Sequence, residues 1–420
     1  MQRMASLLTF TTLNESTTAA KLYPRRGALN LVKKNKTIQT PACLTYTIRG
    51  AVPHLIVDNL SGLPIDMCHL SLEHFLEEKE PSSLKYPYGI HKYTHLENHL
   101  VFCDMRDPQN DHPVTFNTDK YLSVDTHGGV RQVTPELWSK VLETYQPDIY
   151  AAMADIICDK DAKMKRVKRS VDRTLRWLDQ CLPKAKELGT PIFAPVMGHT
   201  SVEERQRSSK ETMERDVEGF TVSVLGLKKD DFTSLLQASL EPLPVNKPKL
   251  AYGLTSPEHI LMGVANGVDL FDGSYAYTMT ERGRAISINF GENLTKMDGK
   301  VDKTINMWDT KLAQTFEPLD PTCGCYSCTT PHTKAYIHHL LNAHEMLATI
   351  LLMGHNIYQL GQFMESIRKS IDGNRFQQDM QSFMEKYNHA KEVDGEQGHV
   401  DELDAESLGV AIKKKRTLLL

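Results

Sequence analysis

Short apolar runs alternate with amphipathic segments through the middle of the chain. The runs predict buried strands, because they are brief, rich in β-branched or aromatic residues and bounded by polar turns; they are Asp148–Met153, Pro191–Met197, Gly219–Leu225, Leu250–Leu254 and Val268–Phe271. The segments between them repeat apolar residues at helical spacing and predict helices; they are Leu137–Tyr145, Lys163–Leu182, Val202–Asp216, Phe232–Leu240 and Pro257–Asn266. Ser256 is the expected N-cap of the last helix.

Strands that alternate with helices at this spacing indicate βα units and a parallel sheet. A closed (β/α)8 TIM barrel fits 420 residues and this rhythm better than an open doubly wound sheet. No G-x-G-x-x-G follows a predicted strand and no G-x-x-x-x-G-K-[ST] occurs, so neither nucleotide-binding motif is supported. The sequence therefore predicts an α/β barrel without a dinucleotide or P-loop site.

The N-terminal third is less regular. We expect strands at Ala28–Val32, Thr37–Thr40 and His99–Met105, and helices at Ala51–Asn59 and Leu70–Glu80. The Pro-, Ser- and Tyr-rich stretch 81–95 is expected to be irregular.

Composition narrows the class of protein. Hydrophobic residues make up 40% and charged residues 24%, as in ordinary soluble proteins, and the formal net charge of −4 argues against a protein that coats nucleic acid non-specifically. No apolar run approaches the roughly 18–20 residues of a membrane span, and residues 1–20 lack a secretory signal pattern. Five cysteines without framework spacing are expected to be reduced thiols, which favours an intracellular protein; they are Cys43, Cys68, Cys103, Cys158 and Cys181.

A C-x-C-x-x-C turn at Cys323, Cys325 and Cys328 is the strongest chemical signal. Three thiols leave one over in any disulfide pairing, whereas zinc takes four tetrahedral ligands from cysteine and histidine. A reduced cysteine cluster without metal is the alternative. The spacing favours one structural zinc ion, which with four protein ligands keeps no open position for water and performs no chemistry.

The fourth ligand comes from the histidines that follow. His332 is close enough to complete a compact knuckle. A helical run is expected at Lys334–Leu352, with further helix at Phe363–Tyr387. His344 and His355 are eleven residues apart, which is three helical turns, so on a continuous helix they would share one face. Spacing alone leaves His332, His344 and His355 equally suitable.

Three regions are expected along the chain. Residues 1–20 form a flexible N-terminus; residues 21–390 form the barrel, including a zinc subdomain at 318–390; residues 391–420 form an acidic linker and a basic tail that are disordered.

Several motifs resemble those of the tRNA-guanine transglycosylases across nearly the whole chain. The matching pieces are Arg26-Gly27-Ala28-Leu29 with Thr40-Pro41, Thr134-Pro135-Glu136, Gly253-Leu254-Thr255-Ser256-Pro257-Glu258, Gly267-Val268-Asp269-Leu270-Phe271-Asp272, and the cysteine motif with Ala335-Tyr336-Ile337-His338-His339. In that family the zinc histidine precedes an asparagine, as His355 precedes Asn356. The resemblance therefore implies zinc bound by Cys323, Cys325, Cys328 and His355.

Members of this family exchange guanine at the tRNA wobble position for a deazaguanine base. The resemblance implies an aspartate that attacks the ribose anomeric carbon and a second aspartate that acts as acid and base. Asp272 stands at the nucleophile's position, at the carboxyl end of a predicted barrel strand, where barrel active sites lie.

The surroundings of Asp272 depart from the catalytic pattern. Gly273-Ser274-Tyr275-Ala276-Tyr277-Thr278 replaces Cys-Val-x-Pro-Thr-Arg, and the segment Asp-Ser-Gly-Gly-Phe-Gln with the acid/base aspartate is absent near Leu100–Asp104. Met197-Gly198-His199 replaces the base-binding Gln-Gly-Gly. Asp155 alone keeps a base-recognition carboxylate, although a structural carboxylate is the simpler interpretation of both Asp155 and Asp272.

An eroded pocket on an intact zinc-bearing scaffold matches the non-catalytic subunits of the eukaryotic enzymes. The resemblance then implies no enzyme activity, no catalytic or substrate-binding residue, and a vestigial nucleophile position at Asp272. It implies a heterodimer with a catalytic subunit that exchanges guanine for queuine in tRNAs with GUN anticodons, while this subunit supports the dimer and positions the tRNA. The implied location is cytoplasmic, with peripheral association with the mitochondrial outer membrane as a further expectation and no transmembrane segment.

Two alternatives remain open. One is an active transglycosylase that uses Asp272 as nucleophile with a substitute base; the other is a zinc-bearing barrel with an unrelated scaffolding role. For RNA contact, the Lys- and Arg-rich stretch Lys163–Arg176 is the candidate, with a solvated helix face as the simpler interpretation.

Overall fold

The computed structural model describes residues 8–14, 21–78, 81–109, 116–126, 128–159, 161–296, 299–330 and 332–387. The segment 391–420, expected to be disordered, lies outside the described residues.

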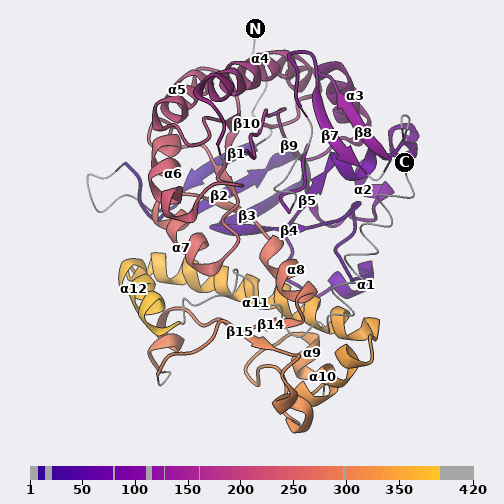
Figure 1. Cartoon of the computed structure of the whole chain (residues 1–420), viewed down its shortest axis with the longest axis vertical. Coiled ribbons are helices and arrows are strands. Elements are labelled where there is room, and N and C mark those ends of the chain that lie inside the picture. Colours follow the sequence, from indigo (N-terminus) through magenta and orange to yellow (C-terminus); the bar gives the residue numbers. More distant parts are fainter. Residues whose placement is uncertain are drawn as a thin grey trace.

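Eight parallel strands close into a barrel, which confirms the expected TIM-barrel class. In barrel order the strands are β4 (Ala42–Tyr46), β5 (Met67–Ser71), β6 (Leu100–Asp104), β9 (Ile149–Ala151), β10 (Ile192–Val196), β11 (Gly219–Ser223), β12 (Lys249–Tyr252) and β13 (Leu270–Asp272). Strand β13 pairs with β4 and completes the ring. Figure 1 shows the barrel in the upper part of the molecule, surrounded by helices.

Helices cover the outside of the barrel. They are α1 (Val57–Leu60), α2 (Gly89–Tyr93), α3 (Pro135–Tyr145), α4 (Met164–Leu188), α5 (Val202–Met213), α6 (Phe232–Leu240), α7 (Pro257–Ala265) and α8 (Ser274–Glu281). Short 3₁₀ helices occupy Val32–Lys34, Leu72–Phe75, Ser82–Lys85, Lys229–Asp231, Gly291–Lys296 and Thr310–Gln314. The expected N-cap is present, because the Ser256 hydroxyl accepts a hydrogen bond from the His259 amide.

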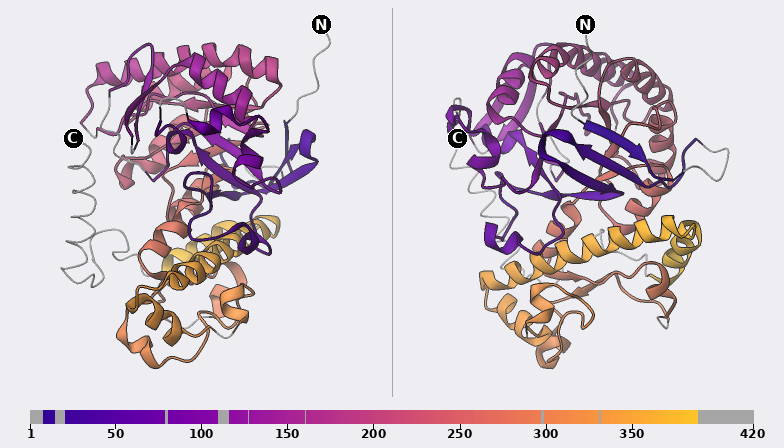
Figure 2. Two further views of the ribbon diagram at one scale, coloured as in Figure 1. Left: turned by 90° about the vertical axis from the view of Figure 1, so that its right-hand side faces the viewer. Right: turned by 180° about the vertical axis from the view of Figure 1, so that it is seen from behind.

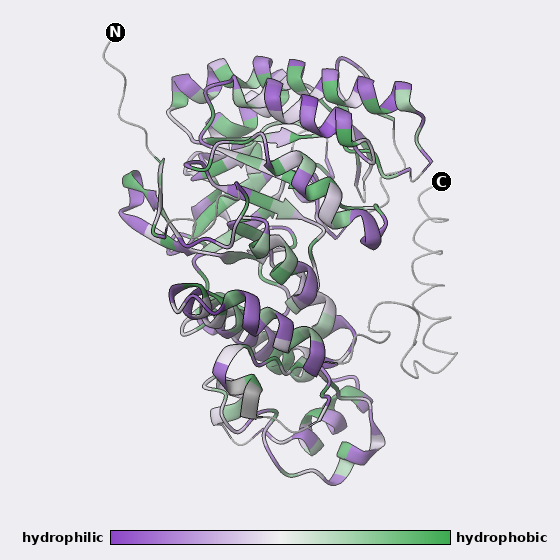
Figure 3. Cartoon of the chain, turned by 90° about the vertical axis from the view of Figure 1, so that its left-hand side faces the viewer, coloured by the Kyte–Doolittle hydropathy of each residue, from purple (hydrophilic) through white to green (hydrophobic). Residues whose placement is uncertain are grey.

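The barrel has two cores, because side chains alternate across each strand. In β6, Leu100 and Phe102 pack inside the barrel with Phe193, whereas Val101 and Cys103 face the surrounding helices. The strands are therefore buried on both faces, which is why they read as continuous apolar runs. Figure 3 shows the hydrophobic strands enclosed by helices with hydrophilic outer surfaces.

A three-stranded antiparallel sheet closes the amino-terminal end of the barrel. It comprises β1 (Leu8–Thr12), β2 (Gly27–Leu31) and β3 (Lys36–Thr40). Leu8, Leu29 and Ile38 belong to the barrel's inner core. Leu8–Thr12, within the segment expected to be a flexible N-terminus, forms strand β1 of this sheet. Figure 2 shows this sheet in indigo across the barrel.

Sequence patterns misassigned the stretch after β4. The predicted helix Leu70–Glu80 begins inside strand β5, and its described residues contain only a 3₁₀ turn, Leu72–Phe75. A strand with one exposed face alternates apolar and polar residues, but both faces of β5 are buried. Its sequence, which includes Cys68 and His69, therefore does not show the alternation that would have identified a strand. The predicted helix Ala51–Asn59 is reduced to α1, and the hairpin of β7 (Leu122–Thr126) and β8 (Gly129–Val133) was not expected.

The carboxyl-terminal part packs below the barrel in Figure 1. Its elements are β14 (Arg284–Ile286), β15 (Thr304–Asn306), α9 (Tyr326–Thr329), α10 (Lys334–Asn342), α11 (Met346–Asp372) and α12 (Phe376–Lys386). The predicted continuous helix from Lys334 is wrong: it breaks at 343–345, where His344 has a positive φ of 55°. Helix α11 packs against β4, α8 and β14, which joins this part to the barrel. Among the described helices, none is long and apolar enough to cross a membrane.

Candidate metal centre and the barrel mouth

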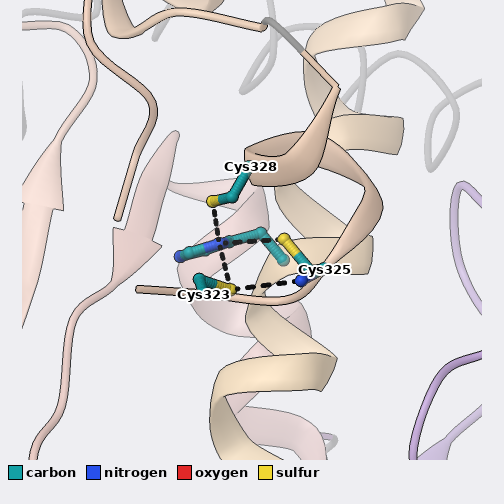
Figure 4. Close-up of side chains that lie close together, drawn as sticks. Cys323, Cys325 and Cys328 are labelled. Carbon is teal, nitrogen blue, oxygen red and sulfur yellow. Dashed lines mark hydrogen bonds between the residues drawn. The ribbon is translucent and has the colours of Figure 1, made fainter. Parts of the chain in front are cut away.

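Three sulfur atoms and one imidazole meet between α9 and α11. Cys323 and Cys325 precede α9, Cys328 lies within it, and His355 projects from the middle of α11. The Nδ1 atom of His355 lies 3.8, 3.5 and 3.4 Å from the Sγ atoms of Cys323, Cys325 and Cys328. Figure 4 shows the three sulfurs gathered around one ring nitrogen.

These separations fit one tetrahedral ion. Bonds of about 2.3 Å to sulfur and 2.0–2.1 Å to nitrogen at tetrahedral angles place the two ligand atoms about 3.6 Å apart. The His355 Nε2–H donates to the carbonyl oxygen of Ile286 at 2.9 Å, which leaves the Nδ1 lone pair facing the sulfurs. Hydrogen bonds from Cys325 and Cys328 lower the pKa of the Cys323 thiol, whereas the bonds with Cys323 and Cys325 raise the pKa of the Cys328 thiol. The four residues can hold a metal ion and are compatible with zinc.

Neighbouring residues hold the cluster in place. The Asn356 side chain accepts a hydrogen bond from the Ile286 amide at 2.8 Å and donates to the Thr280 hydroxyl at 2.9 Å. Gly324 lies against Tyr358, whose hydroxyl oxygen would be 2.6 Å from an added Cβ atom. The cysteine loop is therefore fixed to α11, and α11 to the barrel helix α8.

The other candidate histidines lie outside this cluster. The ring of His332 stacks on that of Tyr336 with 6.0 Å between centroids. His344 is exposed at the break between α10 and α11, so the expectation that it shares a helical face with His355 was wrong. The sequence motif His355-Asn356, rather than residue spacing, identified the histidine that the structure brings to the sulfurs.

Asp272 is buried at the carboxyl end of β13, with 2% of its surface exposed. One carboxylate oxygen accepts from the Gly253 amide at 3.1 Å, and the other accepts from the Ser274 hydroxyl and amide. Burial raises the pKa of Asp272, while these hydrogen bonds act in the opposite direction. The carboxylate is thus held by the loop after β12 and by the first residue of α8.

The backbone after Asp272 leaves no room for a side chain. A Cβ atom on Gly273 would lie 2.1 Å from the carbonyl oxygen of Leu44 on the adjacent strand. Helix α8 begins at the next residue, Ser274. The cysteine that follows the nucleophile in the catalytic pattern could not occupy this position.

The segment after β6 crosses the barrel mouth. Asp107 accepts hydrogen bonds from the Tyr46 hydroxyl at 2.8 Å and the His74 ring at 3.0 Å, and Gln109 accepts from Thr278 of α8 at 3.1 Å. Protein atoms surround most of the Asp104 carboxyl at the end of β6, and this burial raises its pKa to about 6. These contacts link the segment to β4, to the 3₁₀ helix Leu72–Phe75 after β5, and to α8.

Asp155 is fully buried and surrounded by cationic and amide donors. Its carboxylate accepts two hydrogen bonds from Arg166 at 2.6 and 2.8 Å, one from Asn117 at 2.6 Å and one from Arg173. Sequence analysis missed these partners. The signal was present, because Arg166 and Arg173 are seven residues apart on α4 and share the face that looks toward the strand end.

Met197-Gly198-His199 lines only a small space. The cavity that these residues share with Ile157 and Arg205 measures about 20 Å³, far below the roughly 300–1,000 Å³ of ordinary small-molecule sites. His199 adopts a positive φ of 48°, and the Arg205 guanidinium donates to its carbonyl oxygen at 2.6 Å. The loop is thus held by its own contacts in a closed arrangement.

Comparison with known proteins agrees with this architecture. A sequence model described as queuine tRNA-ribosyltransferase matches residues 21–389. Proteins named queuine tRNA-ribosyltransferase accessory subunit 2 are similar along most of their length. The one from Ixodes scapularis is 35% identical, covering 79% of this chain and 89% of its own length. The human one is 32% identical, covering 81% and 91%, and the one from Trichoplax adhaerens is 34% identical, covering 84% and 94%.

A closed eight-stranded barrel, a Cys3His cluster and these matches lead to one conclusion: the chain belongs to the queuine tRNA-ribosyltransferase family.

Proposed function

We propose that this chain is a non-catalytic subunit that pairs with the catalytic subunit of a queuine tRNA-ribosyltransferase. The partner exchanges guanine for queuine at the wobble position of tRNAs with GUN anticodons, and this chain supports the dimer and positions the RNA. The name that the relatives carry, accessory subunit, supports this assignment.

The environment of Asp272 carries the proposal. Displacement at an anomeric carbon needs a carboxylate oxygen that reaches the reacting atom at about 3–3.5 Å. Both oxygens of Asp272 are engaged by Gly253 and Ser274, and the side chain is buried. An attack from this position would require these hydrogen bonds to rearrange and the site to open.

The base-recognition positions support the same conclusion. A guanine or deazaguanine ring is recognised by free hydrogen-bonding groups in a cavity of its own size. The Asp155 carboxylate already accepts four hydrogen bonds from Asn117, Arg166 and Arg173. The adjoining space beside His199 is about the size of one water molecule.

We also propose that the metal is zinc, held by Cys323, Cys325, Cys328 and His355 with a structural role. Four protein ligands leave no position for a reacting water. The hydrogen bond from His355 to Ile286 and those of Asn356 connect the cysteine loop to β14 and α8. A metal ion that orders this loop would therefore also hold these two elements in place. The ion thereby stabilises the carboxyl-terminal part that protrudes below the barrel.

The surface of that part suits a partner subunit. Large apolar side chains are exposed around the metal loop, and aromatic residues and methionine are enriched at protein interfaces; these side chains are Phe316, Tyr326, Tyr336, Met346 and Leu347. We assign this surface to the catalytic subunit. The cytoplasmic location and the association with the mitochondrial outer membrane remain proposals that rest on the resemblance alone.

Trapping of a covalent enzyme–RNA intermediate tests the absence of catalysis. We expect the isolated chain, incubated with tRNA and free base, to form no denaturation-resistant adduct, whereas a catalytic family member in the same assay forms one. An adduct that disappears in Asp272→Ala would establish instead an active transglycosylase.

A further inference from the structure

Helix α4 begins with a group of cations that the fold does not use. Lys163, Lys165, Lys168 and Arg169 are exposed at its amino-terminal end. In the part of the chain that the structure describes, no carboxylate lies within ion-pair distance of any of the four. We call these four residues the α4 basic patch.

Their position is unfavourable for the helix itself. The amino-terminal end of a helix carries a partial positive charge, so cations there reduce its stability and acidic residues increase it. The first turn of α4 contains no acidic residue. In contrast, Arg166 and Arg173 turn toward the barrel and bind Asp155. The outward cations therefore need an explanation other than stabilisation of α4.

An exposed aromatic residue is linked to the start of α4 through a chain of hydrogen bonds. Phe116 is 90% exposed, the largest exposed fraction among the large hydrophobic side chains described. Its backbone is fixed, because its carbonyl oxygen accepts from Ser123 at 2.9 Å and the next residue, Asn117, donates to Asp155. Because Asp155 also binds Arg166 of α4, Phe116 is held near the start of the helix.

Exposed cations on the same side of the molecule as an exposed aromatic ring are features that bind a nucleic acid strand with unpaired bases. The cations contact phosphates, and the ring stacks on a base of any sequence. The patch lies at the carboxyl end of β9, on the barrel face where this architecture places its binding sites. Helix α4 runs along the top of the barrel in Figure 1, away from the metal loop.

We propose that the α4 basic patch and Phe116 form an RNA-docking surface, on which phosphates contact Lys163, Lys165, Lys168 and Arg169 and one unpaired base stacks on Phe116. This rests on the proposed function for its biological ligand, tRNA. The surface positions RNA without reading its sequence.

The test measures tRNA binding by fluorescence anisotropy, both for the heterodimer and for the isolated chain. Binding is measured between about 50 and 200 mM salt, because affinity that depends on phosphate contacts falls steeply over this range. The patch variant is Lys163→Gln, Lys165→Gln, Lys168→Gln and Arg169→Gln combined. The matched control is Lys184→Gln with Lys186→Gln, at the other end of the same helix, where both lysines already bind carboxylates. Phe116→Ala is compared with Tyr88→Ala, an exposed aromatic at the opposite end of the barrel.

We expect the patch variant to reduce the slope of log affinity against log salt by about 3, because each phosphate contact contributes about 0.7–0.9. Phe116→Ala should weaken binding at least about fivefold, and both controls should bind like the original chain. The melting temperature of the patch variant should be unchanged or raised, because it removes cations from a helix amino terminus.

An unchanged slope and affinity in the patch variant would overturn the proposal, as would binding of that surface to phosphatidylserine vesicles in place of tRNA. These outcomes are distinct from failure of the proposed function. If the chain pairs with no catalytic subunit, the function is wrong, while binding to the isolated chain still decides the docking surface.

Discussion

The His355 Nε2–H donates to the carbonyl oxygen of Ile286 at 2.9 Å, and this single bond orients the opposite ring nitrogen toward three sulfur atoms. A helix of the carboxyl-terminal part is thus joined to strand β14 through a residue of the candidate metal centre. We therefore propose that binding of the metal and packing of the carboxyl-terminal part depend on the same side chain.

Replacement of His355 by alanine should remove the bound metal. Three cysteines alone lack the fourth tetrahedral ligand, and structural zinc contributes about 10–16 kcal/mol of apparent binding free energy in small zinc domains. We expect loss of stoichiometric zinc by metal analysis and a clear fall in melting temperature. His344→Ala, an exposed residue outside the cluster, is the control and should retain both. Full zinc occupancy in His355→Ala would disprove the ligand assignment.

Replacement of Asp155 by asparagine should destabilise the barrel. Breaking a buried ion pair leaves its partner's charge uncompensated and costs about 3–5 kcal/mol, and Arg173 is largely buried. Asp119→Asn is the matched control, because Asp119 also binds Arg173 but is exposed, so its loss should cost less than about 1 kcal/mol. Denaturant unfolding measures both. Equal costs would show that Asp155 does not serve as a structural carboxylate.

Titration of Glu73 should make the free energy of unfolding depend on pH. Burial raises its pKa from 4.5 to about 7, although a hydrogen bond from the Asp107 amide opposes the shift. Between these values the folded chain retains a proton that the unfolded chain has lost, so the free energy of unfolding falls as pH rises through this window.

Glu73→Gln removes that term and keeps an acceptor for the Asp107 amide. Relative to the original chain, the variant should gain up to about 3 kcal/mol of stability between about pH 4.5 and 7. Urea unfolding across this range measures the difference, with the exposed Glu97→Gln as control. A difference that does not vary with pH would contradict the raised pKa of Glu73.

Structural features that depend on the residues of a single segment could be predicted from the sequence. The barrel followed from apolar runs that alternate with helices, and the cysteine motif identified three of the four residues of the candidate metal centre. Features that depend on contacts between distant parts of the chain could not be predicted in this way. Strand β5 is buried on both faces despite Cys68 and His69, and its polar residues point into surroundings that only the closed barrel creates.

The barrel mouth shows the same limit. The loss of the family motifs around Asp272 and His199 indicated an eroded pocket, but not what fills it. The two arginines that bind Asp155 come from a helix eleven and eighteen residues further along the chain. Their direction depends on how α4 packs against the barrel, which periodicity alone does not determine.

Guanine exchange by a mixture of this chain with the catalytic subunit tests the non-catalytic role most directly. We predict a 1:1 complex with much higher exchange activity than the catalytic subunit alone. The complex that carries Asp272→Ala in this chain should retain nearly all of that activity once its assembly is verified. If Asp272→Ala left the complex intact but abolished exchange, this chain would be the subunit that performs the chemistry, and its assignment as an accessory subunit would be wrong.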